Sequence, residues 1–362
     1  MVRLSRRQFV KLVLAGATTA ALSPILHARA NYPTARTLLT PTPTPDPVTD
    51  SYLLMGRAIR AVTIYSEPST SATRVRTLQR DQAIELLEEV RAPFSRHNDL
   101  WYRTPEGYVH SAWVLPVRVY PPQPFIEDVG SWGFWGEVSQ IYTDAYFRPA
   151  LNAGRAYRFY GTSTFHVITS YKDEAGTGWY KVYDEFPPTQ PTFQWVLARD
   201  IRRIPRAEMA PITPFVGQKR IEINLSTQTL TCFEGDKPVF STKTASGLGE
   251  HATPTGRHYV VLKQVSRHMC NRPYKEDQEP VPPEEIYDLP GVPWNTFFDL
   301  EGRAIHGCYW HNDFGITRSH GCVNVSPDAA RFVYRWTHPV GGFEDDFVQS
   351  NYKVGTPIDI FY

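Results

Sequence analysis

Two stretches of the chain present the same order of aromatic, basic and apolar residues, and this repetition limits the folds open to it. A Trp-Tyr-Arg run at 101–103 precedes a strand-like aromatic-valine pair, and a Trp-Tyr-Lys run at 179–181 precedes a second such pair. Recurrence of one pattern in one order is typical of a duplicated structural unit. The sequence therefore predicts two similar small units, at residues 57–120 and 130–205.

The local pattern within these units is that of short strands. Apolar and polar residues alternate at 61–65 and again near 84–87, and turn-forming residues at 66–69 separate the two runs. The chain also contains 31 prolines and 13% aromatic residues. Because proline is excluded from helix interiors, this composition favours strands and loops. We expect a mainly β protein that begins with two small β-barrels.

The first 30 residues have the features of an export signal. A twin-arginine pair, Arg6 and Arg7, precedes a moderately apolar run, and residues 28–30 (ARA) form a small-residue cleavage site. An uncleaved membrane anchor is the alternative, but the apolar run is short for a span of about 20 residues. Residues 31–56, rich in proline and threonine, are expected to form an extended linker. A second proline-containing linker is expected at 205–216.

Charge and cysteine content exclude two classes of protein. The formal net charge is +1, which argues against nucleic acid as a partner. The chain has only 4 cysteines at long spacings, so it is not a scaffold held by disulfides. We expect a globular protein outside the cytoplasm, with contact to a membrane only through the export signal if that signal is retained.

Residues 217–362 read as a third unit, built on a β-sheet. Apolar and polar residues alternate from 221 to 225, as in a half-buried strand, and strands are also expected at 259–262 and 356–360. One helix is expected after Ser326, a good N-cap residue followed by proline. Its apolar residues recur at helical spacing and would form one face: Ala329, Phe332, Val333 and Trp336.

The residues with the clearest chemistry lie between 305 and 324. Cys322 stands in the run 319–324 (SHGCVN), and His306 lies upstream in the run 305–307 (IHG). A thiol becomes a good nucleophile when an imidazole takes its proton. The imidazole needs a third group to fix its tautomer. No acidic residue has an obvious spacing for this, so the Gly307 carbonyl is the natural candidate.

Three other interpretations of these residues remain open. Cys322 could be an inert buried cysteine, and His306 a core histidine with satisfied hydrogen bonds. Zinc binding is also possible, although the spacing matches no common zinc motif. The potential zinc ligands are His306, Cys308, His311, His320 and Cys322.

At this point the sequence resembles a known family. His306, twelve intervening residues and the SHGCVN run at 319–324 are similar to the signature of L,D-transpeptidases with a YkuD-type catalytic domain. The TPTG run at 253–256 and the helix start at 326–330 also match, and the likeness covers residues 217–362. The two upstream units resemble bacterial SH3-like domains. The expected fold is therefore two SH3-like barrels followed by an L,D-transpeptidase-type β-sandwich with one or more short helices.

The resemblance implies roles for individual residues. Cys322 would be the nucleophile, His306 the general base, and the Gly307 carbonyl would orient the imidazole. Backbone N–H groups around residues 320–322 would bind the oxyanion. The side chains expected to shape the site or face the substrate are Ser319, His320, Asn324, Tyr309, Trp310 and Trp294, together with Gly321.

The resemblance also implies a function. The expected reaction is transpeptidation of peptidoglycan stem peptides in the cell envelope, after export by the twin-arginine machinery, with no cofactor and no metal. Hydrolysis by an L,D-carboxypeptidase and a non-catalytic wall-binding role are the alternatives. Cys232 and Cys270 are expected to be dispensable for activity. Cys308 departs from the family pattern; it would either form an inactivating disulfide or be buried and silent.

Overall fold

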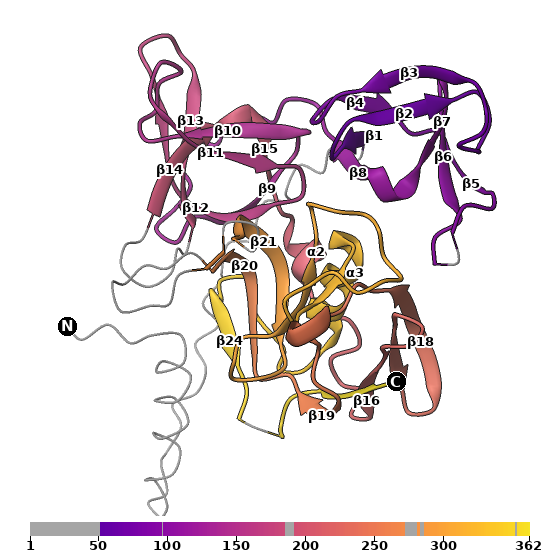
Figure 1. Cartoon of the computed structure of the whole chain (residues 1–362). Coiled ribbons are helices and arrows are strands. Elements are labelled where there is room, and N and C mark those ends of the chain that lie inside the picture. The colour runs from indigo at the N-terminus through magenta and orange to yellow at the C-terminus, as the bar shows by residue number, and fades with distance from the viewer. Residues whose placement is uncertain (1–50, 96, 185–191, 272–280, 283–285, 352) are drawn as a thin grey trace, which may run out of the picture.

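The computed structural model describes residues 51–362, apart from 96, 185–191, 272–280, 283–285 and 352. The predicted export signal and most of the first linker lie outside these residues. In the part of the chain that is described, strands predominate and the prediction of a mainly β protein is confirmed. No helix in this part is long and apolar enough to cross a membrane. Figure 1 shows two β units packed on one side of a larger C-terminal domain.

The first β unit (residues 53–119) contains two sheets, with strand orders β4-β1-β8 and β3-β2-β7-β6-β5. It begins inside the predicted linker, because Leu53 and its neighbours pair with the last strand of the unit. The linker prediction is therefore wrong at its end. The strands are β1 (Leu53–Ala58), β2 (Val62–Tyr65), β3 (Arg74–Leu78), β4 (Ala83–Glu85), β5 (Glu88–Arg91), β6 (Leu100–Thr104), β7 (Gly107–His110) and β8 (Val114–Val119).

The second β unit (residues 134–203) is one seven-stranded sheet in the order β11-β10-β14-β13-β12-β9-β15. The strand order is the same as in the first unit, with one difference. The nine-residue β12 takes the place of both β4 and β5, so it joins into one sheet what are two sheets in the first unit. This agreement supports a duplication. Trp101 and Trp179 are fully buried at matching places in the two units, as expected of core tryptophans. The strands are β9 (Phe134–Val138), β10 (Tyr142–Tyr146), β11 (Arg155–Tyr160), β12 (Thr164–Lys172), β13 (Gly178–Asp184), β14 (Thr192–Leu197) and β15 (Ile201–Arg203). Their assignment as SH3-like domains stays a prediction.

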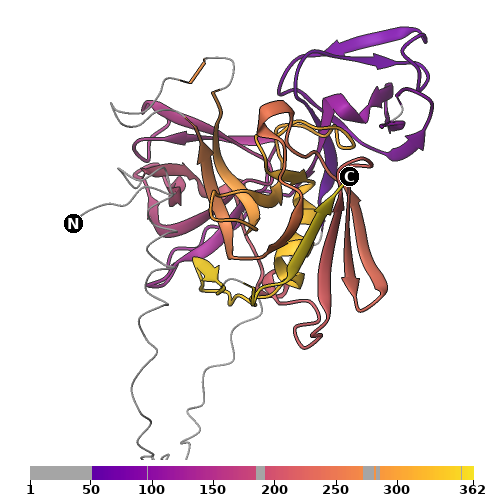
Figure 2. The same cartoon turned by 60° about the horizontal axis from the view of Figure 1, so that its bottom comes forward.

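The C-terminal domain (residues 219–361) contains two five-stranded sheets, ordered β18-β17-β16-β25-β19 and β23-β22-β21-β20-β24. Figure 2 shows strands β16–β18 (red) apart from β20 and β21 (orange), with the final strand (yellow) beside β16. The first sheet comprises β16 (Lys219–Asn224), β17 (Thr229–Glu234), β18 (Lys237–Lys243), β19 (Gly256–Tyr259) and β25 (Pro357–Phe361). The second comprises β20 (Leu262–Cys270), β21 (Asp288–Phe297), β22 (Ala304–Gly307), β23 (Val323–Val325) and β24 (Phe347–Gln349).

The predicted helix is present as α3 (Pro327–Trp336), and the Ser326 side chain accepts a hydrogen bond from the Ala329 N–H at 3.3 Å. Its apolar face packs in the main core of the domain with residues of both sheets. The second linker contains a short helix, α2 (Arg206–Met209), and Met209 joins the same core. The strand expected at 259–262 is instead the break between β19 and β20, since Val260 and Val261 lie outside both strands.

Two buried lysines hold the C-terminal end of α3. Lys263 Nζ donates to the carbonyl oxygens of Tyr334 at 2.7 Å and Thr337 at 3.0 Å, and Lys219 Nζ donates to Trp336 O at 2.7 Å. These carbonyl groups have no partner within the helix, so the lysines satisfy them in the core. Burial lowers the pKa of Lys263 to about 7. The helix is thereby fixed along its axis, which places its first residue beside β22.

Candidate active site

The sheet topology brings His306 and Cys322 onto neighbouring strands. Strands β22 and β23 are parallel and hydrogen-bonded, with His306 opposite Asn324 and Ile305 opposite Val323. Cys322 immediately precedes β23. Its backbone therefore enters β23 next to Val323, which pairs with Ile305, the neighbour of His306. The strand that carries His306 therefore lies beside the strand that Cys322 precedes.

His306 is buried, with 2% of its surface exposed, and Nδ1 lies 3.1 Å from the Gly307 carbonyl oxygen. The predicted contact is present. A carbonyl only accepts, so Nδ1 carries the proton and Nε2 is the basic nitrogen of the neutral ring. Trp310, half-buried, packs near the imidazole with a ring separation of 5.7 Å. His306 is thus held in the tautomer that a general base requires.

Residue 307 has to be glycine for steric reasons. A Cβ atom there would lie 2.8 Å from Pro293 Cγ and 3.1 Å from Pro327 Cα. Side chains rarely approach that closely, and a larger residue would displace the backbone. The close packing of β21, β22 and the start of α3 thus fixes the carbonyl that orients His306.

Cys322 lies at the end of a tight turn that its neighbours close. Gly321 has φ +105°, a conformation that L side chains rarely adopt. The Ser319 hydroxyl donates to Cys322 O and accepts from the Gly321 N–H at 3.2 Å. Because the Gly321 N–H already donates to Ser319, it is not available to bind the oxyanion, unlike the prediction for residues 320–322. Ser319 acts by shaping the turn that presents the thiol.

A second segment supports this turn from the other side of β23. Ala245 and Asn324 exchange two backbone hydrogen bonds, of 2.9 and 3.0 Å. The Thr253 hydroxyl donates to Gly321 O at 3.1 Å and accepts from the Gly247 N–H at 2.8 Å. The sequence analysis noted the TPTG run that contains Thr253 as a match to the family but assigned this threonine no role. The structure gives this threonine a place in the support of the nucleophile turn.

Asn324 is anchored by a histidine. Its side-chain nitrogen lies 3.0 Å from His311 Nε2, and both residues are buried. Burial lowers the pKa of His311 to about 3, so the ring is neutral and Nε2 accepts a hydrogen bond from the amide. Because Asn324 lies opposite His306, His311 helps to fix the strand position next to the base.

His320 is exposed at the mouth of the turn, between two aromatic rings. Its ring centroid lies 4.9 Å from that of His251 and 5.2 Å from that of Tyr287. The sequence analysis did not identify His251 or Tyr287, since neither lies near the motif in the chain. The three side chains form an accessible rim from which a substrate could be contacted.

Two of the expected substrate-facing aromatics are in fact core residues. Trp294 is 2% exposed and packs against Tyr334 of α3, and Tyr309 is 2% exposed with its hydroxyl donating to Pro290 O at 2.6 Å. A buried ring has no surface to offer a ligand, so these two assignments are wrong. Trp310 remains the aromatic residue next to His306.

The loop cysteines and histidines do not converge as a zinc site. Among the described residues, the group of three or more potential ligands within reach of one ion is His268, Cys270 and Asp288, on other strands. Cys308 is 1% exposed, and its thiol donates to His311 O at 3.5 Å. All four cysteines, each among the described residues, are thiols and not disulfides. Cys308 is therefore a buried thiol, and its lack of a role in the reaction stays a prediction.

Thiol reactivity should separate Cys322 from its neighbours. Burial raises the pKa of the Cys308 thiol to about 12, whereas Cys322 is partly exposed. Only the thiolate reacts, so brief treatment with iodoacetamide at pH 8 should label Cys322 first, half-buried Cys270 more slowly, and neither Cys308 nor Cys232. Peptide mass spectrometry measures the order. Labelling of Cys308 as fast as Cys322 would contradict this geometry.

The first β unit contacts the loop between the two candidate catalytic residues, residues 308–321, hereafter the catalytic loop. Asn312 Nδ2 lies 3.3 Å from the Tyr102 hydroxyl and 3.2 Å from the carbonyl oxygens of both Ser111 and Val114. Arg57, also from the first unit, donates to the Tyr309 carbonyl oxygen at 2.6 Å.

A histidine of the first unit makes another contact to this loop. His97 Nε2 lies 3.1 Å from Asp313 Oδ1, while the other oxygen of Asp313 binds Arg318 at 2.7 Å. Hydrogen bonds and burial on both sides of the loop restrict its movement. The first unit is therefore part of what positions the site.

Replacing Asn312 with alanine should test this coupling. The variant loses about two hydrogen bonds of roughly 0.5–1.5 kcal/mol each, and we expect a lower melting temperature and a several-fold slower reaction of Cys322 with acylating reagents. Asn351→Ala, at an exposed asparagine, is the matched control and should change neither. Unchanged acylation in Asn312→Ala would show that the loop holds its position without the first unit.

The fold and the site together define a class of protein. A partly exposed cysteine follows a glycine turn beside the strand of a buried imidazole, which a carbonyl orients, in a two-sheet domain with one packed helix. Residues 218–360 match the family model described as the L,D-transpeptidase catalytic domain, YkuD. The chain therefore carries a YkuD L,D-transpeptidase catalytic domain.

Solved structures of L,D-transpeptidases are similar to the chain. A mutant of the Enterococcus faecium L,D-transpeptidase is 19% identical with a TM-score of 0.30, over 48% of this chain and 56% of that one. The Stackebrandtia nassauensis L,D-transpeptidase is 18% identical with a TM-score of 0.28, over 43% and 60%. That from Mycobacterium smegmatis is 15% identical with a TM-score of 0.32, over 51% and 89%. The chain thus spans less than two thirds of the first two. A comparison with curated proteins gave no match.

Proposed function

We propose that the protein is a peptidoglycan L,D-transpeptidase in which Cys322 is the nucleophile and His306 the general base. The observation that carries this proposal is the parallel pairing of β22 and β23 inside a YkuD domain, since β22 contains His306 and Cys322 directly precedes β23. The hydrogen bond from His306 to Gly307 O supports the role of the base.

The proposed reaction has two steps. The Cys322 sulfur attacks the carbonyl carbon of the diamino acid that precedes the terminal D-alanine of a tetrapeptide stem, and its proton passes to His306. The bond to D-alanine breaks, and D-alanine leaves with that proton as a free amine. An amine of a second stem then attacks the thioester, loses a proton to His306 and releases the thiol, which gives a 3→3 cross-link.

Each step passes through a tetrahedral oxyanion that needs nearby donors. Backbone N–H groups of the turn around Cys322 are the proposed source, without that of Gly321, which Ser319 occupies. Loss of one such donor typically slows acyl transfer by about 10²–10³-fold. Ser319 and Thr253 support this role indirectly, because both hold the turn in shape. Trp310 and His320 are the proposed contacts for the stem peptide.

The remaining parts of the chain are assigned to delivery and positioning. The twin-arginine signal at residues 1–30 would export the protein, which places the reaction in the cell envelope. The two β units, as SH3-like modules, would hold the enzyme against its polymeric substrate and raise the effective concentration of stems. The contacts of the first unit to the catalytic loop support a positioning role for that unit as well.

Incubation of the purified protein with a disaccharide-tetrapeptide donor tests the proposal. Intact-protein mass spectrometry should detect a thioester that retains the stem without its D-alanine. Addition of a second stem should yield a cross-linked dimer. A free tripeptide without any dimer would support hydrolysis by an L,D-carboxypeptidase instead. Absence of both the thioester and a covalent carbapenem adduct would support a non-catalytic wall-binding protein.

A further inference from the structure

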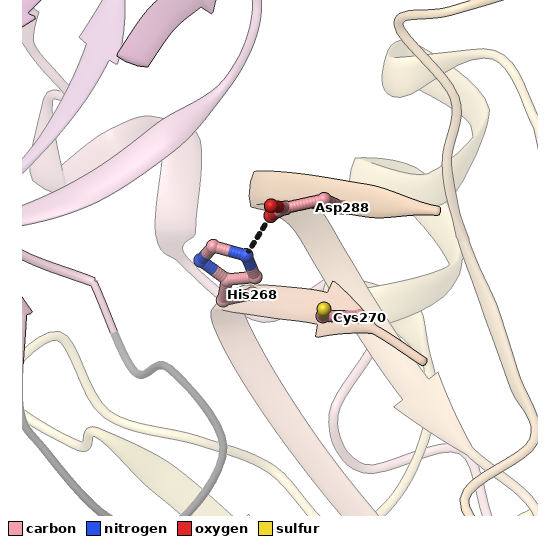
Figure 3. A group of neighbouring side chains, drawn as sticks. All are labelled: His268, Cys270 and Asp288. Carbon is pink, nitrogen blue, oxygen red and sulfur yellow. Dashed lines mark hydrogen bonds and ion pairs between the residues drawn. The ribbon is translucent and has the colours of Figure 1, made fainter. Parts of the chain in front are cut away.

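A second cluster of reactive side chains lies outside the active site, where the second β unit meets the C-terminal domain. His268 Nε2, Cys270 Sγ and a carboxylate oxygen of Asp288 all lie within 4.8 Å of one another. Figure 3 shows the His268 ring beside Asp288, with the Cys270 sulfur on the same strand. The imidazole side chain is fully buried, and the proposed function uses none of the three residues.

The sheet places these side chains together by simple geometry. His268 and Cys270 are two positions apart on β20, and Cys270 pairs directly with Asp288 on the adjacent strand β21. Directly paired residues project from one face of a sheet, and His268, at an irregularity of β20 between Arg267 and Met269, lies within reach of both. The cluster is therefore built on two paired strands and does not depend on a loop.

A fourth residue completes the arrangement from the second β unit. Asp184, at the end of β13, is fully buried, and its Oδ2 lies 2.6 Å from His268 Nδ1. Asp184 Oδ1 also accepts a hydrogen bond from the Gly291 N–H at 3.4 Å. A carboxylate on one ring nitrogen, with the other nitrogen directed at further ligands, is the usual way in which proteins orient a metal-binding histidine.

Small shifts of these side chains would form a tetrahedral zinc site. His268 Nε2 and Asp288 Oδ1 are 2.7 Å apart. Zinc bonds of about 2.0–2.3 Å separate ligand atoms by roughly 3.3–3.6 Å, so this pair would open slightly and the sulfur would approach. Imidazole, thiolate and carboxylate are together the ligand types that zinc prefers.

We propose that His268, Cys270 and Asp288 bind one zinc ion and that Asp184 orients His268. The ion would join β20 to β21, and through Asp184 it would tie the second β unit to the C-terminal domain. Binding is an acid–base exchange without redox change. The imidazole nitrogen and the thiol each release one proton and each form one bond to the metal.

A proton competes with the metal for the ring nitrogen of His268 that faces Asp288. Burial opposes a charge on His268, but its hydrogen bonds to Asp184 and Asp288 prevail and raise its pKa to about 9. Without metal, a proton therefore links the imidazole to the two carboxylates. The alternative to a zinc site is that this ion-paired histidine alone holds the two units together.

Titration of the metal-free protein with Co²⁺, followed by competition with Zn²⁺, distinguishes a zinc site from an ion-paired histidine without metal. Cobalt bound to Cys270 gives a thiolate charge-transfer absorption, which should saturate at one equivalent and disappear when zinc is added. The measurement is made on Cys322→Ser protein, so that the active-site thiol cannot contribute. Calorimetry with Zn²⁺ should give the same stoichiometry.

Two substitutions test the ligands. Cys270→Ser keeps the bridge from Asp184 through His268 to Asp288, so the fold is retained, yet it should abolish the cobalt band and weaken zinc binding at least tenfold. Asp184→Asn should weaken zinc binding by about 10–100-fold. Zinc should raise the melting temperature of the parent protein and not that of Cys270→Ser. A missing cobalt band, or a band that survives in Cys270→Ser, would overturn the zinc site and leave the ion-paired histidine.

Discussion

Replacing Cys322 with alanine is expected to lower the release of D-alanine from tetrapeptide stems by at least about 10³-fold and to abolish the covalent carbapenem adduct. The reason is that no other thiol lies in the proposed site with access to substrate, because Cys308 and Cys232 are buried and Cys270 lies in the separate cluster with His268 and Asp288. A coupled assay for free D-alanine measures the first effect, and intact-protein mass measures the second.

Cys308→Ala is the matched control for this experiment. It removes a thiol from the same loop but one that the structure assigns no chemistry, so the adduct should still form. Continued D-alanine release by Cys322→Ala would refute the assignment of the nucleophile. Loss of the adduct in both variants, with both folded, would place Cys308 in the reaction and contradict its burial.

Replacing His306 with glutamine is expected to slow acylation of Cys322 by about 10²–10⁴-fold, the usual contribution of a general base. Glutamine preserves a polar side chain opposite Asn324 but cannot take a proton from the thiol. The rate of carbapenem acylation, followed by stopped-flow absorbance, measures the effect. Raising the pH should partly restore the rate in the variant, because hydroxide can then generate the thiolate.

The circular dichroism spectrum and melting temperature of His306→Gln provide its control, since His306 is buried and its loss could disturb β22. A folded variant that acylates at the parental rate would show that the thiolate forms without this imidazole. A rate that falls without any recovery at high pH would assign His306 to positioning of the substrate and not to proton transfer.

Local pattern was sufficient to predict several parts of the structure. The helix after Ser326 and its cap followed from residue types that act within one turn. The contact of His306 with Gly307 could be predicted because the two residues are adjacent. The duplication was visible because buried Trp101 and Trp179 occupy equal places in short strand sequences that repeat.

Other parts depend on contacts between distant segments, which no local pattern contains. Asn312 reaches the Tyr102 hydroxyl across 210 positions of sequence, and His268 reaches Asp184 across 84. Trp294 was assigned to the substrate because an aromatic residue near a motif can face either side of a sheet; its φ of +59° and its burial against α3 are set by tertiary packing.

The attachment of Asn312 to the first β unit also limits how the domains of this protein can be exchanged with those of other proteins. A chimera that joined residues 219–361 to a foreign targeting module would leave the Asn312 amide without its three oxygen neighbours. Exchange of the N-terminal units at the second linker alone should therefore lower the reactivity of Cys322, because the catalytic loop loses these contacts. A working chimera should therefore keep residues 53–119 together with residues 308–321. Substitutions on one side of their interface should be matched by substitutions on the other.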